Sequence, residues 1–378
     1  MPFYSLQNKK MNILHVSTTK SWRGGEQQIA YLAKELSQKK LNQRILCPMG
    51  SKLASHCEAH NIKYITFNKK SSFSLSTARH IQSVCKEKRI DLIHVHDSHA
   101  HTFAVLAASL FGNKSPIIVS RRVDFPIGGN IFSKWKYNHP SVKKILTVSR
   151  FIKQLIKAKI KDQSKIQVVY DGVDEKRFPF KKSNILHHEY GISDDIKLIG
   201  NVAALAPHKD YYTFVKTVEE FFKISKKEVK FLIIGADDGE QDGIEQFIKN
   251  RKLTDKIIVT GFRNDIPKIL PELDIFLFTS KEEGLGTSIL DAFICGVPVV
   301  ATRAGGVPEI VIHNDTGLTA EIENAKQLAE HIKSVLSNKT IAKKLIINAK
   351  RLVNSFSIET MAEKTYAIYI DVVKKDYL

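Results

Sequence analysis

Two successive series of short apolar runs alternate with helical stretches, and this alternation constrains the fold more than any other feature of the chain. The first series has apolar runs at residues 12–17, 43–47, 63–67, 92–96, 117–120, 144–148 and 167–169, and the second at 197–203, 230–235, 256–260, 273–278 and 298–301. Strands that alternate with helices are typical of parallel sheets with helical crossovers. We therefore predict an α/β protein of two tandem, doubly wound, Rossmann-like domains that face each other across a cleft.

A charged, turn-rich segment at residues 171–195 separates the two series and predicts a linker. We predict a disordered extension at residues 1–10, a first domain at 11–185, a second domain at 186–355 and a final helical segment at 356–378. After Gly317 the pattern is helical, with predicted helices at 325–337, 341–354 and 357–375. A length of 378 residues suits two domains.

The composition is that of a globular protein without a membrane-spanning segment. No run of about 18 apolar residues is present, and residues 1–10 lack the apolar stretch of a secretory signal. Four widely spaced cysteines predict reduced thiols in a cytoplasmic protein rather than disulfides or a zinc site.

The net charge of +19 is concentrated in the first half of the chain. Residues 1–180 contain 31 Lys and Arg against 11 Asp and Glu, which gives +20, whereas the remainder has 27 against 28, which gives −1. Such asymmetry favours an anionic partner for the first half: lipid headgroups, nucleic acid or a phosphorylated acceptor. A solvated surface rich in lysine is the alternative.

Two carboxylates flank a predicted strand-to-helix turn in the second half, Glu283 before it and Asp291 in the first helical turn. A helix amino terminus presents unpaired N–H groups that bind phosphate, and carboxylates accept hydrogen bonds from hydroxyls. This arrangement suits a nucleotide-sugar. The residues between the acids are Gly284, Leu285, Gly286 and Thr287. Alternatively, Ser288 and Asp291 form a capping box and the glycines only shape the turn.

Two further strand-to-helix junctions carry groups suited to phosphate. Gly24 and Gly25 follow the first strand, where a glycine turn permits close approach of a ligand to the backbone. Lys209 follows the first strand of the second half and could neutralise a diphosphate leaving group. An ordinary turn and a solvated lysine are the corresponding alternatives.

Four histidines lie within residues 94–101, namely His94, His96, His99 and His101. Strand alternation sends His94 and His96 to one side, whereas the other two begin a helix. Metal ligation is one interpretation. A polar lining with one histidine near the acceptor, or a structural role, is favoured over it.

Arg121 and Arg122 follow another strand of the first half and could capture a phosphate or carboxylate, or else pair with Asp124. Residues 149–163 predict a basic amphipathic helix. It could lie on an anionic membrane or pack on the core with a solvated rim.

Motifs over nearly the whole chain resemble those of the retaining glycosyltransferases of family 4, the group 1 glycosyl transferases with the GT-B fold. In the second half they are Glu283-x7-Asp291 and the runs at 295–302 and 305–309. In the first half they are the run at 13–16 with Gly24-Gly25, the "D-[IV]-[IV]-H-x-H" strand at 91–96, and the runs at 147–149, 170–174 and 177–178.

The resemblance implies that the first domain binds the acceptor and the second binds a nucleotide-sugar. Glu283 would contact hydroxyls of the donor sugar and Asp291 those of the ribose. Lys209, the Gly24-Gly25 loop and the amides of residues 285–287 would hold the diphosphate. His96 and Arg122 would act on the acceptor side. Family members retain the anomeric configuration, usually need no metal or other cofactor, close one domain onto the other, and have a last helix that crosses back to the first domain.

From this resemblance we predict an enzyme, a hexosyltransferase. It would move a hexose or N-acetylhexosamine from a UDP- or GDP-sugar to a lipid-linked or saccharide acceptor in polysaccharide or lipopolysaccharide synthesis. We expect it in the cytoplasm, held on the anionic inner face of the plasma membrane by its basic first domain, with no nucleic-acid partner. Two alternatives remain: a nucleotide-sugar epimerase of the same fold, and a basic membrane- or nucleic-acid-binding module with an inactive site.

Three positions depart from the family pattern. Asp291 stands where the family usually has Glu, Ala204 where many members have an Arg, and Arg122 where many have a His. Without the Arg, the diphosphate would depend on Lys209, backbone amides or another cation such as Arg303.

Overall fold

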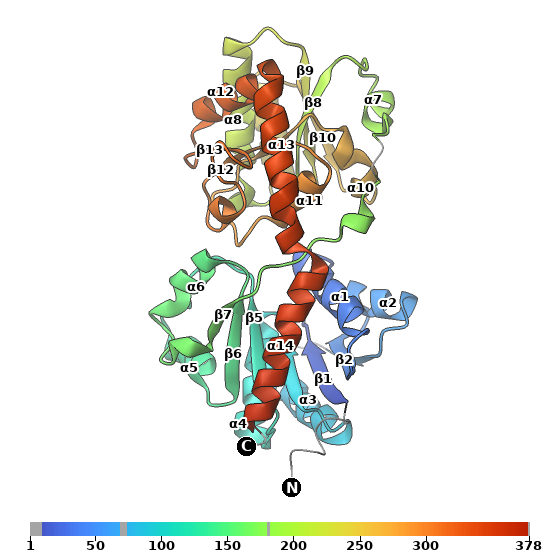
Figure 1. Cartoon of the computed structure of the whole chain (residues 1–378), viewed down its shortest axis with the longest axis vertical. Coiled ribbons are helices and arrows are strands. Elements are labelled where there is room, and N and C mark those ends of the chain that lie inside the picture. The colour runs from blue at the N-terminus through green and yellow to red at the C-terminus, as the bar shows by residue number, and fades with distance from the viewer. Residues whose placement is uncertain (1–9, 69–73, 180–181, 377–378) are drawn as a thin grey trace. The chain divides into compact units, whose positions relative to one another are not determined.

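The computed structural model describes residues 10–68, 74–179 and 182–376. The chain forms two compact units, the first made of Met1–Gly172 with Ile358–Leu378 and the second of Val173–Ser357. Of the predicted disordered extension at residues 1–10, all but Lys10 lies outside the described residues. Each unit is an α/β structure with a parallel sheet, which confirms the predicted fold class (Figure 1).

The first unit contains a seven-stranded parallel sheet in the order β3-β2-β1-β4-β5-β6-β7. Its strands are β1 (Met11–Val16), β2 (Leu41–Pro48), β3 (Tyr64–Phe67), β4 (Leu92–Val95), β5 (Ile117–Arg121), β6 (Val142–Thr147) and β7 (Ile166–Val168). Its helices are α1 (Gly24–Leu36), α2 (Lys52–Ala59), α3 (Leu75–Glu87), α4 (Ser98–Phe111), α5 (Ile131–Asn138), α6 (Arg150–Lys157) and α14 (Ile358–Asp376).

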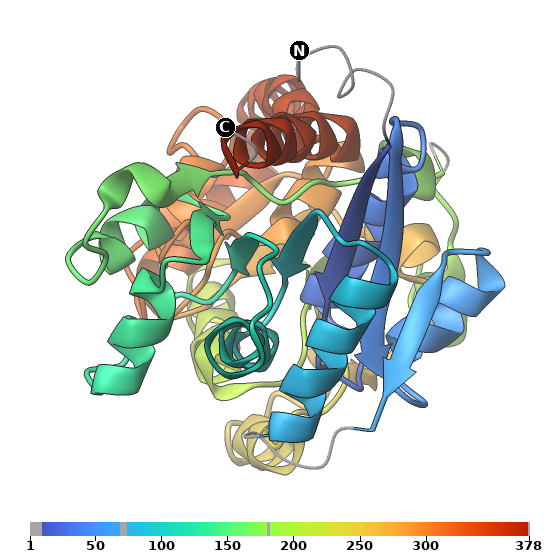
Figure 2. The same ribbon diagram turned by 90° about the horizontal axis from the view of Figure 1, so that it is seen from below.

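Helix α14 packs on the same sheet face as α1 (Figure 2). One buried cluster joins Tyr31, Leu32 and Leu36 of α1, Met361 and Tyr369 of α14, and strand residues from β1 to β6. Helices α3 and α4 pack against each other. Strands buried on both faces, such as β4 and β5, require near-continuous apolar sequence, which is why their apolar runs predicted them correctly.

The second unit contains a six-stranded parallel sheet in the order β10-β9-β8-β11-β12-β13. Its strands are β8 (Lys197–Val202), β9 (Val229–Ile234), β10 (Ile257–Gly261), β11 (Ile275–Phe278), β12 (Val299–Thr302) and β13 (Leu318–Ala320). Its helices are α7 (Ile185–Glu189), α8 (Tyr211–Ile224), α9 (Gln241–Asn250), α10 (Ile266–Ile269), α11 (Thr287–Ile294), α12 (Ala325–Ser337) and α13 (Lys339–Val353).

Three predicted elements differ from the structure. The chain after Gly317 is not wholly helical, because Leu318–Ala320 forms the edge strand β13, whose three residues are too few to give a periodic signal. Helix α6 ends at Lys157, short of the predicted residue 163. The predicted linker at 171–195 contains the 3-10 helix Glu175–Arg177 and α7.

Hydrogen bonds explain why the division between units falls at Gly172, earlier than the predicted boundary after residue 185. The side chain of Gln28 donates to the carbonyl of Gly172 and accepts from its N–H, which holds that residue on α1. The carboxylate of Glu272 accepts bonds from the N–H groups of Ile185 and Leu186, which ties the predicted linker to the second unit.

Within the described residues, no helix combines the length and apolarity needed to span a membrane. The four cysteines are free thiols, as the sequence predicted, and three of them are buried.

Candidate active site

Each sheet has one topological switch point, where the strand order reverses and neighbouring crossovers diverge. In the first unit it lies between β1 and β4, and in the second between β8 and β11. Ligands of open α/β sheets bind beyond the carboxyl ends of the strands at such points. The segments that follow these four strands contain Gly24 and Gly25 at the start of α1, His96, Lys209 and Glu283 respectively.

Lys209 and Glu283 form an ion pair at the switch point of the second unit. The Lys209 Nζ lies 2.5 Å from Glu283 Oε2, and only 16% and 15% of the two side chains are exposed. The ammonium also lies 5.4 Å from the ring centroid of Phe278, at the end of β11. The structure therefore brings together a cation and a carboxylate that the sequence places far apart.

The backbone around Lys209 is held by side chains on both flanks. Asp210, at φ +48°, caps α8 by accepting from the N–H of Thr213. The hydroxyl of Thr279 donates to the carbonyls of Lys209 and Asp210, at 3.2 and 3.1 Å. These bonds fix the loop after β8 against the loop after β11.

The backbone of Glu283 is held by the glycine turn that follows β12. The N–H of Gly306 donates to the Glu283 carbonyl at 2.9 Å. A Cβ at Gly305, whose φ is +51°, would lie 2.0 Å from that carbonyl oxygen. Only glycine permits this approach, so the turn at 305–306 sets the position of Glu283.

Helix α11 begins at Thr287 with Gly286 as its N-cap, at φ +92°. Glycine has no side chain to cap the helix, and no side-chain cap bond is formed at this end. Ser288 lies inside the helix rather than at the N-cap, so the capping-box alternative is wrong. Gly284 and Leu285 are buried beside this turn. Apart from the N–H of Ile289, which donates to the Gly286 carbonyl, the first-turn amides thus remain available as hydrogen-bond donors to an anion.

Asp291 lies in the second turn of α11, rather than the first turn where the sequence placed it. Its carboxylate is 4.0 Å from the Arg177 guanidinium, with 19% of the Asp291 side chain exposed. Burial raises the Asp291 pKa from 3.8 to about 6, and the Arg177 charge opposes this rise. The pairing with Arg177 was not predicted, because it joins residues far apart in sequence.

Ala204 and Arg303, the two positions discussed for diphosphate binding, differ in charge and in their hydrogen-bond partners. Ala204 is exposed and carries no charge. Arg303 donates to Glu321 and to Thr319, at the end of β13. It is therefore engaged along that strand, whereas Lys209 lies at the switch point.

In the first unit, Gly24 and Gly25 form the first turn of α1 rather than a turn before it. The predicted helix start at Glu26 is therefore two residues late. Glu26 accepts from the N–H of Arg23, the N-cap residue, at 3.1 Å. A Cβ at either glycine would meet no atom within 4 Å, so packing does not demand glycine there.

His96 belongs to a buried group of three histidines. Its Nε2 lies 3.0 Å from His15 Nδ1, and its ring stacks on His15 at 5.3 Å between centroids. His94 contacts Tyr369 Oη through Nδ1 at 2.5 Å and Ser120 Oγ through Nε2 at 2.8 Å. As alternation predicted, His94 and His96 lie on one side of β4, with ring centroids 4.1 Å apart.

These three histidines have nitrogen atoms within 4.8 Å of one another, a spacing that could hold a metal ion. Burial lowers the pKa of His15 to about 4 and those of His94 and His96 well below their usual range, so the rings are neutral. Both nitrogens of His94 already have hydrogen-bond partners, which favours a structural hydrogen-bonded cluster over a ligand set. His99 and His101 lie in α4, as predicted.

Arg122 pairs with Asp171 rather than standing free at a rim. Its Nε lies 3.0 Å from Asp171 Oδ1, and both side chains are largely buried. Burial raises the Asp171 pKa, and the adjacent guanidinium opposes that rise. Arg122 and His96 line one cavity of about 680 Å³ in the first unit, which Gly25 also borders.

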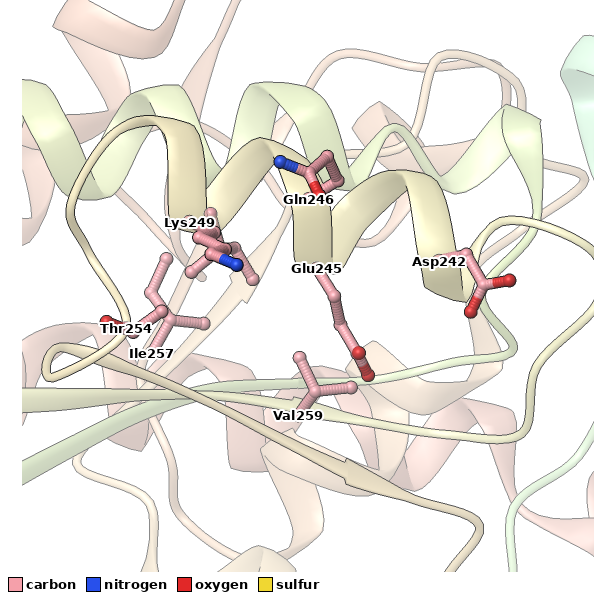
Figure 3. Close-up of a pocket in the computed structure, with 8 residues that line it drawn as sticks. Asp242, Glu245, Gln246, Lys249, Thr254, Ile257 and Val259 are labelled. Atoms are coloured by element: carbon pink, nitrogen blue, oxygen red, sulfur yellow. The ribbon is translucent and has the colours of Figure 1, made fainter.

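A second cavity, of about 580 Å³, lies in the second unit between α9 and the edge strand β10 (Figure 3). It is lined by Asp242, Glu245, Gln246, Ile248, Lys249, Thr254, Ile257 and Val259. Strands β9 and β8 separate β10 from β11, so this groove is at the sheet edge and not at the switch point.

Comparison with known proteins agrees with this geometry. The sequence matches the family described as Glycosyltransferase Family 4 over residues 22–177, and Glycosyl transferases group 1 over residues 182–352. Two doubly wound units with these motifs define a glycosyltransferase of the GT-B fold. The chain belongs to glycosyltransferase family 4, as the sequence motifs predicted.

Two relatives of known description are distant and match about four fifths of the chain. The N-acetyl-alpha-D-glucosaminyl L-malate synthase of Bacillus anthracis is 25% identical, over 80% of this chain and 81% of its own. An Escherichia coli galactosyltransferase, UDP-Gal:alpha-D-GlcNAc-diphosphoundecaprenol alpha-1,3-galactosyltransferase, is 23% identical over 78% of each chain.

Solved structures share the fold. A glycosyltransferase from Rickettsia africae has a TM-score of 0.84 and 25% identity, with coverage of 97% of this chain and 99% of that one. The Anabaena protein HepE, solved with UDP and glucose, has a TM-score of 0.82 and 20% identity, with coverage of 96% and 100%.

Proposed function

We propose that this glycosyltransferase is a retaining hexosyltransferase. It transfers a hexose or N-acetylhexosamine from a UDP- or GDP-sugar, bound by the second unit, to a lipid-linked or saccharide acceptor bound by the first. We place it in the synthesis of a cell-surface polysaccharide or lipopolysaccharide. The E. coli relative, which acts on a diphosphoundecaprenol-linked sugar, and the UDP complex of HepE support this class of donor and acceptor.

The observation that carries the proposal is the Lys209–Glu283 pair at the switch point of the second unit. Without a ligand the two charges neutralise each other. A nucleotide-sugar offers each a new partner: the diphosphate accepts from the Lys209 ammonium, and hydroxyls of the sugar donate to the Glu283 carboxylate. The uncapped amides of α11 supply further donors to the diphosphate.

In the proposed reaction, the bond between the anomeric carbon and the diphosphate oxygen breaks, and its electron pair leaves with the diphosphate. The acceptor hydroxyl oxygen attacks the same face of the sugar and forms the new bond. Its proton passes to a diphosphate oxygen. Lys209 stabilises the charge that develops on the leaving group, a contribution that is larger in the transition state than in the ground state.

The remaining predicted residues receive supporting roles. Asp291 accepts from the ribose hydroxyls, and the first-turn amides of α1 at Gly24 and Gly25 assist with the diphosphate. His96 and Arg122 act on the acceptor side. No metal is required in this scheme, because Lys209 and the amides neutralise the diphosphate, so turnover should persist in excess chelator.

Association with a membrane forms part of the proposal. Helix α5 begins with Ile131, 86% exposed, and α6 contains Phe151, 39% exposed. Lys153 and Lys157 lie on the same helix as Phe151. Exposed apolar groups among lysines suit the surface of an anionic bilayer, where lipid-linked acceptors reside.

The test is a thermal-shift panel of nucleoside diphosphates and their sugars with the full-length protein. A cognate nucleotide at about 100 times its Kd should stabilise the protein by about 2.7 kcal/mol. The cognate donor is then incubated with candidate acceptors, and the anomeric configuration of the product is read by NMR. Absence of stabilisation by every nucleotide would refute the proposal, and an epimerised donor without acceptor would identify an isomerase instead.

A further inference from the structure

The cavity of about 680 Å³ in the first unit, which Arg122 and His96 line, carries more basic than acidic side chains. Lys20, Arg23, Arg121 and Arg122 line it, together with the carboxylates Glu26 and Asp97. His96 lines the same cavity, so a ligand there lies beside the residue that we assign to the acceptor side.

Arg121, at the end of β5, is 5% exposed and holds only uncharged hydrogen-bond partners. Its Nη1 donates to the hydroxyl of Tyr137 at 2.7 Å, and its Nη2 donates to the carbonyl of Phe125. Its Nε has no partner among the described residues. The rings of Phe125 and Tyr137 lie 5.5 and 5.6 Å from the guanidinium carbon and compensate part of the charge.

Lys136, on α5, is a second buried cation with uncharged partners. It is 5% exposed, and its Nζ donates to the carbonyl and hydroxyl of Ser98 and to the hydroxyl of Thr102, at 2.9 to 3.2 Å. Ser98 lines the cavity, so Lys136 lies behind that part of the wall. Burial, and then the charge of Arg121, lower the Lys136 pKa to about 8, while Asp97 acts in the opposite direction.

The carboxylates around the cavity are committed to other donors. Asp97 accepts from the N–H and hydroxyl of Thr18 and from two amides of α4. Glu26 accepts from Ser17 and from the N–H of Arg23. Asp171 pairs with Arg122. Within the described part of the chain, neither Arg121 nor Lys136 forms an ion pair with a carboxylate.

Buried charges in folded proteins are normally paired, because leaving a buried charge without a counter-charge is costly. Two such cations beside one cavity indicate that the missing counter-charge arrives with a ligand. We propose that the acceptor carries an anionic group, a carboxylate or a phosphate, which binds in this cavity against Arg121, with Lys136 adding charge from behind Ser98. This inference rests on the proposed function, since it names the acceptor class of the same site.

The experiment compares three small probes that share a glucose ring: glucuronate, glucose 6-phosphate and the uncharged methyl α-D-glucoside. Binding to the full-length protein is measured by saturation-transfer NMR in saturating UDP, so that the proposed donor site is occupied. We expect an anionic probe to bind at least about tenfold more tightly than the glucoside, as charge-assisted hydrogen bonds require. Glucuronate and glucose 6-phosphate distinguish a carboxylate from a phosphate acceptor.

Two variants locate the site. Arg121→Gln and Lys136→Met should each weaken binding of the anionic probe about tenfold, while Lys249→Met, on α9 of the second unit, should leave it unchanged. Both tryptophans, Trp22 and Trp135, lie in the first unit, so their emission reports whether that unit is folded. If Arg121→Gln fails to fold, the affinity of Lys136→Met for the anionic probe tests the inference.

Equal affinity for the glucoside and the anions, or full anion affinity in folded Arg121→Gln or Lys136→Met, would overturn the inference. If UDP binds and no anion does, the inference fails and the proposed function stands. If UDP itself does not bind, the proposed function fails, and the assignment of the anion as an acceptor fails with it.

Discussion

At the scale of single residues, Lys209 is the group whose charge matters most to the proposed reaction. Lys209→Met keeps much of the side-chain volume and the contact with Phe278 but removes the charge. Loss of one group that stabilises developing negative charge costs about 2–4 kcal/mol, so kcat should fall about 10²- to 10³-fold. Steady-state rates with the cognate donor measure this. Lys249→Met, on α9, is the matched control. If Lys209→Met turned over at the wild-type rate, Lys209 would have no part in the mechanism.

Asp291 should make the stability of the second unit depend on pH. Because burial raises its folded pKa from 3.8 to about 6, the folded state holds a proton that the unfolded state has lost between these values. Stability is therefore lost as pH rises from about 4 to about 6, by at most about 3 kcal/mol. Asp291→Asn should remove this component. Urea titrations followed by circular dichroism at pH 4 and pH 7 test it, and equal pH dependence in both proteins would contradict it.

The sequence alone was enough to predict most of the candidate site residues, but not the residues that they contact. Glu283, Lys209 and His96 could be predicted because each follows a strand, and strand ends at a switch point converge. Arg177 beside Asp291, Asp171 beside Arg122 and Tyr369 beside His94 could not. Each pair joins segments far apart in sequence, and its formation depends on tertiary packing that local patterns do not encode.

At the scale of elements, the turn after β12 fixes the position of Glu283. A Cβ at Gly305 would overlap the Glu283 carbonyl, so Gly305→Ala should displace Glu283. Misplacement by about 1 Å can cost about 10²-fold in rate, and we expect a loss of about tenfold to 10²-fold. Gly239→Ala is the control, because its φ is also positive but nothing lies within 4 Å. The comparison separates displacement of Glu283 from backbone strain, and equal rates in the two variants would exclude displacement.

Helix α14 is held against the sheet of the first unit by a hydrogen bond as well as by apolar packing. The Tyr369 hydroxyl, on α14, lies 2.5 Å from His94 Nδ1 on β4, and both residues are fully or almost fully buried. Tyr369→Phe leaves a buried nitrogen without its partner, which costs about 1–3 kcal/mol. Tryptophan emission during urea unfolding measures the loss in the first unit. Tyr366→Phe, half-buried on the same helix, serves as control. Equal stability of the two variants would show that the hydrogen bond between Tyr369 and His94 does not stabilise the first unit.

At the scale of the whole molecule, the pattern of apolar runs was sufficient to predict two parallel α/β units, because strands buried on both faces need continuous apolar sequence. The place where the chain passes from one unit to the other was not predictable. It depends on Gln28 holding Gly172 and on Glu272 holding Ile185 and Leu186, and neither bond leaves a local signal.

The charge asymmetry of the molecule leads to a prediction about membranes. If the basic first unit binds anionic lipid, the protein should co-sediment with phosphatidylglycerol vesicles at 0.1 M salt. Binding should be lost at 1 M, where the Debye length falls from about 10 to about 3 Å. Each lysine near the surface contributes about 1 kcal/mol, so Lys153→Gln with Lys157→Gln should weaken binding at least about tenfold. Equal binding to uncharged phosphatidylcholine vesicles would contradict an electrostatic contact.

The first unit is discontinuous in sequence, because α14 returns to it after the second unit is complete. During synthesis, all residues of the second unit are therefore made before the helix that covers one face of the first sheet. Until then, the apolar face that α14 covers, including Tyr31 and Leu36 of α1, remains open to solvent or to a chaperone. A released chain that ends at residue 357 should thus contain a complete second unit and a first unit that lacks its last helix.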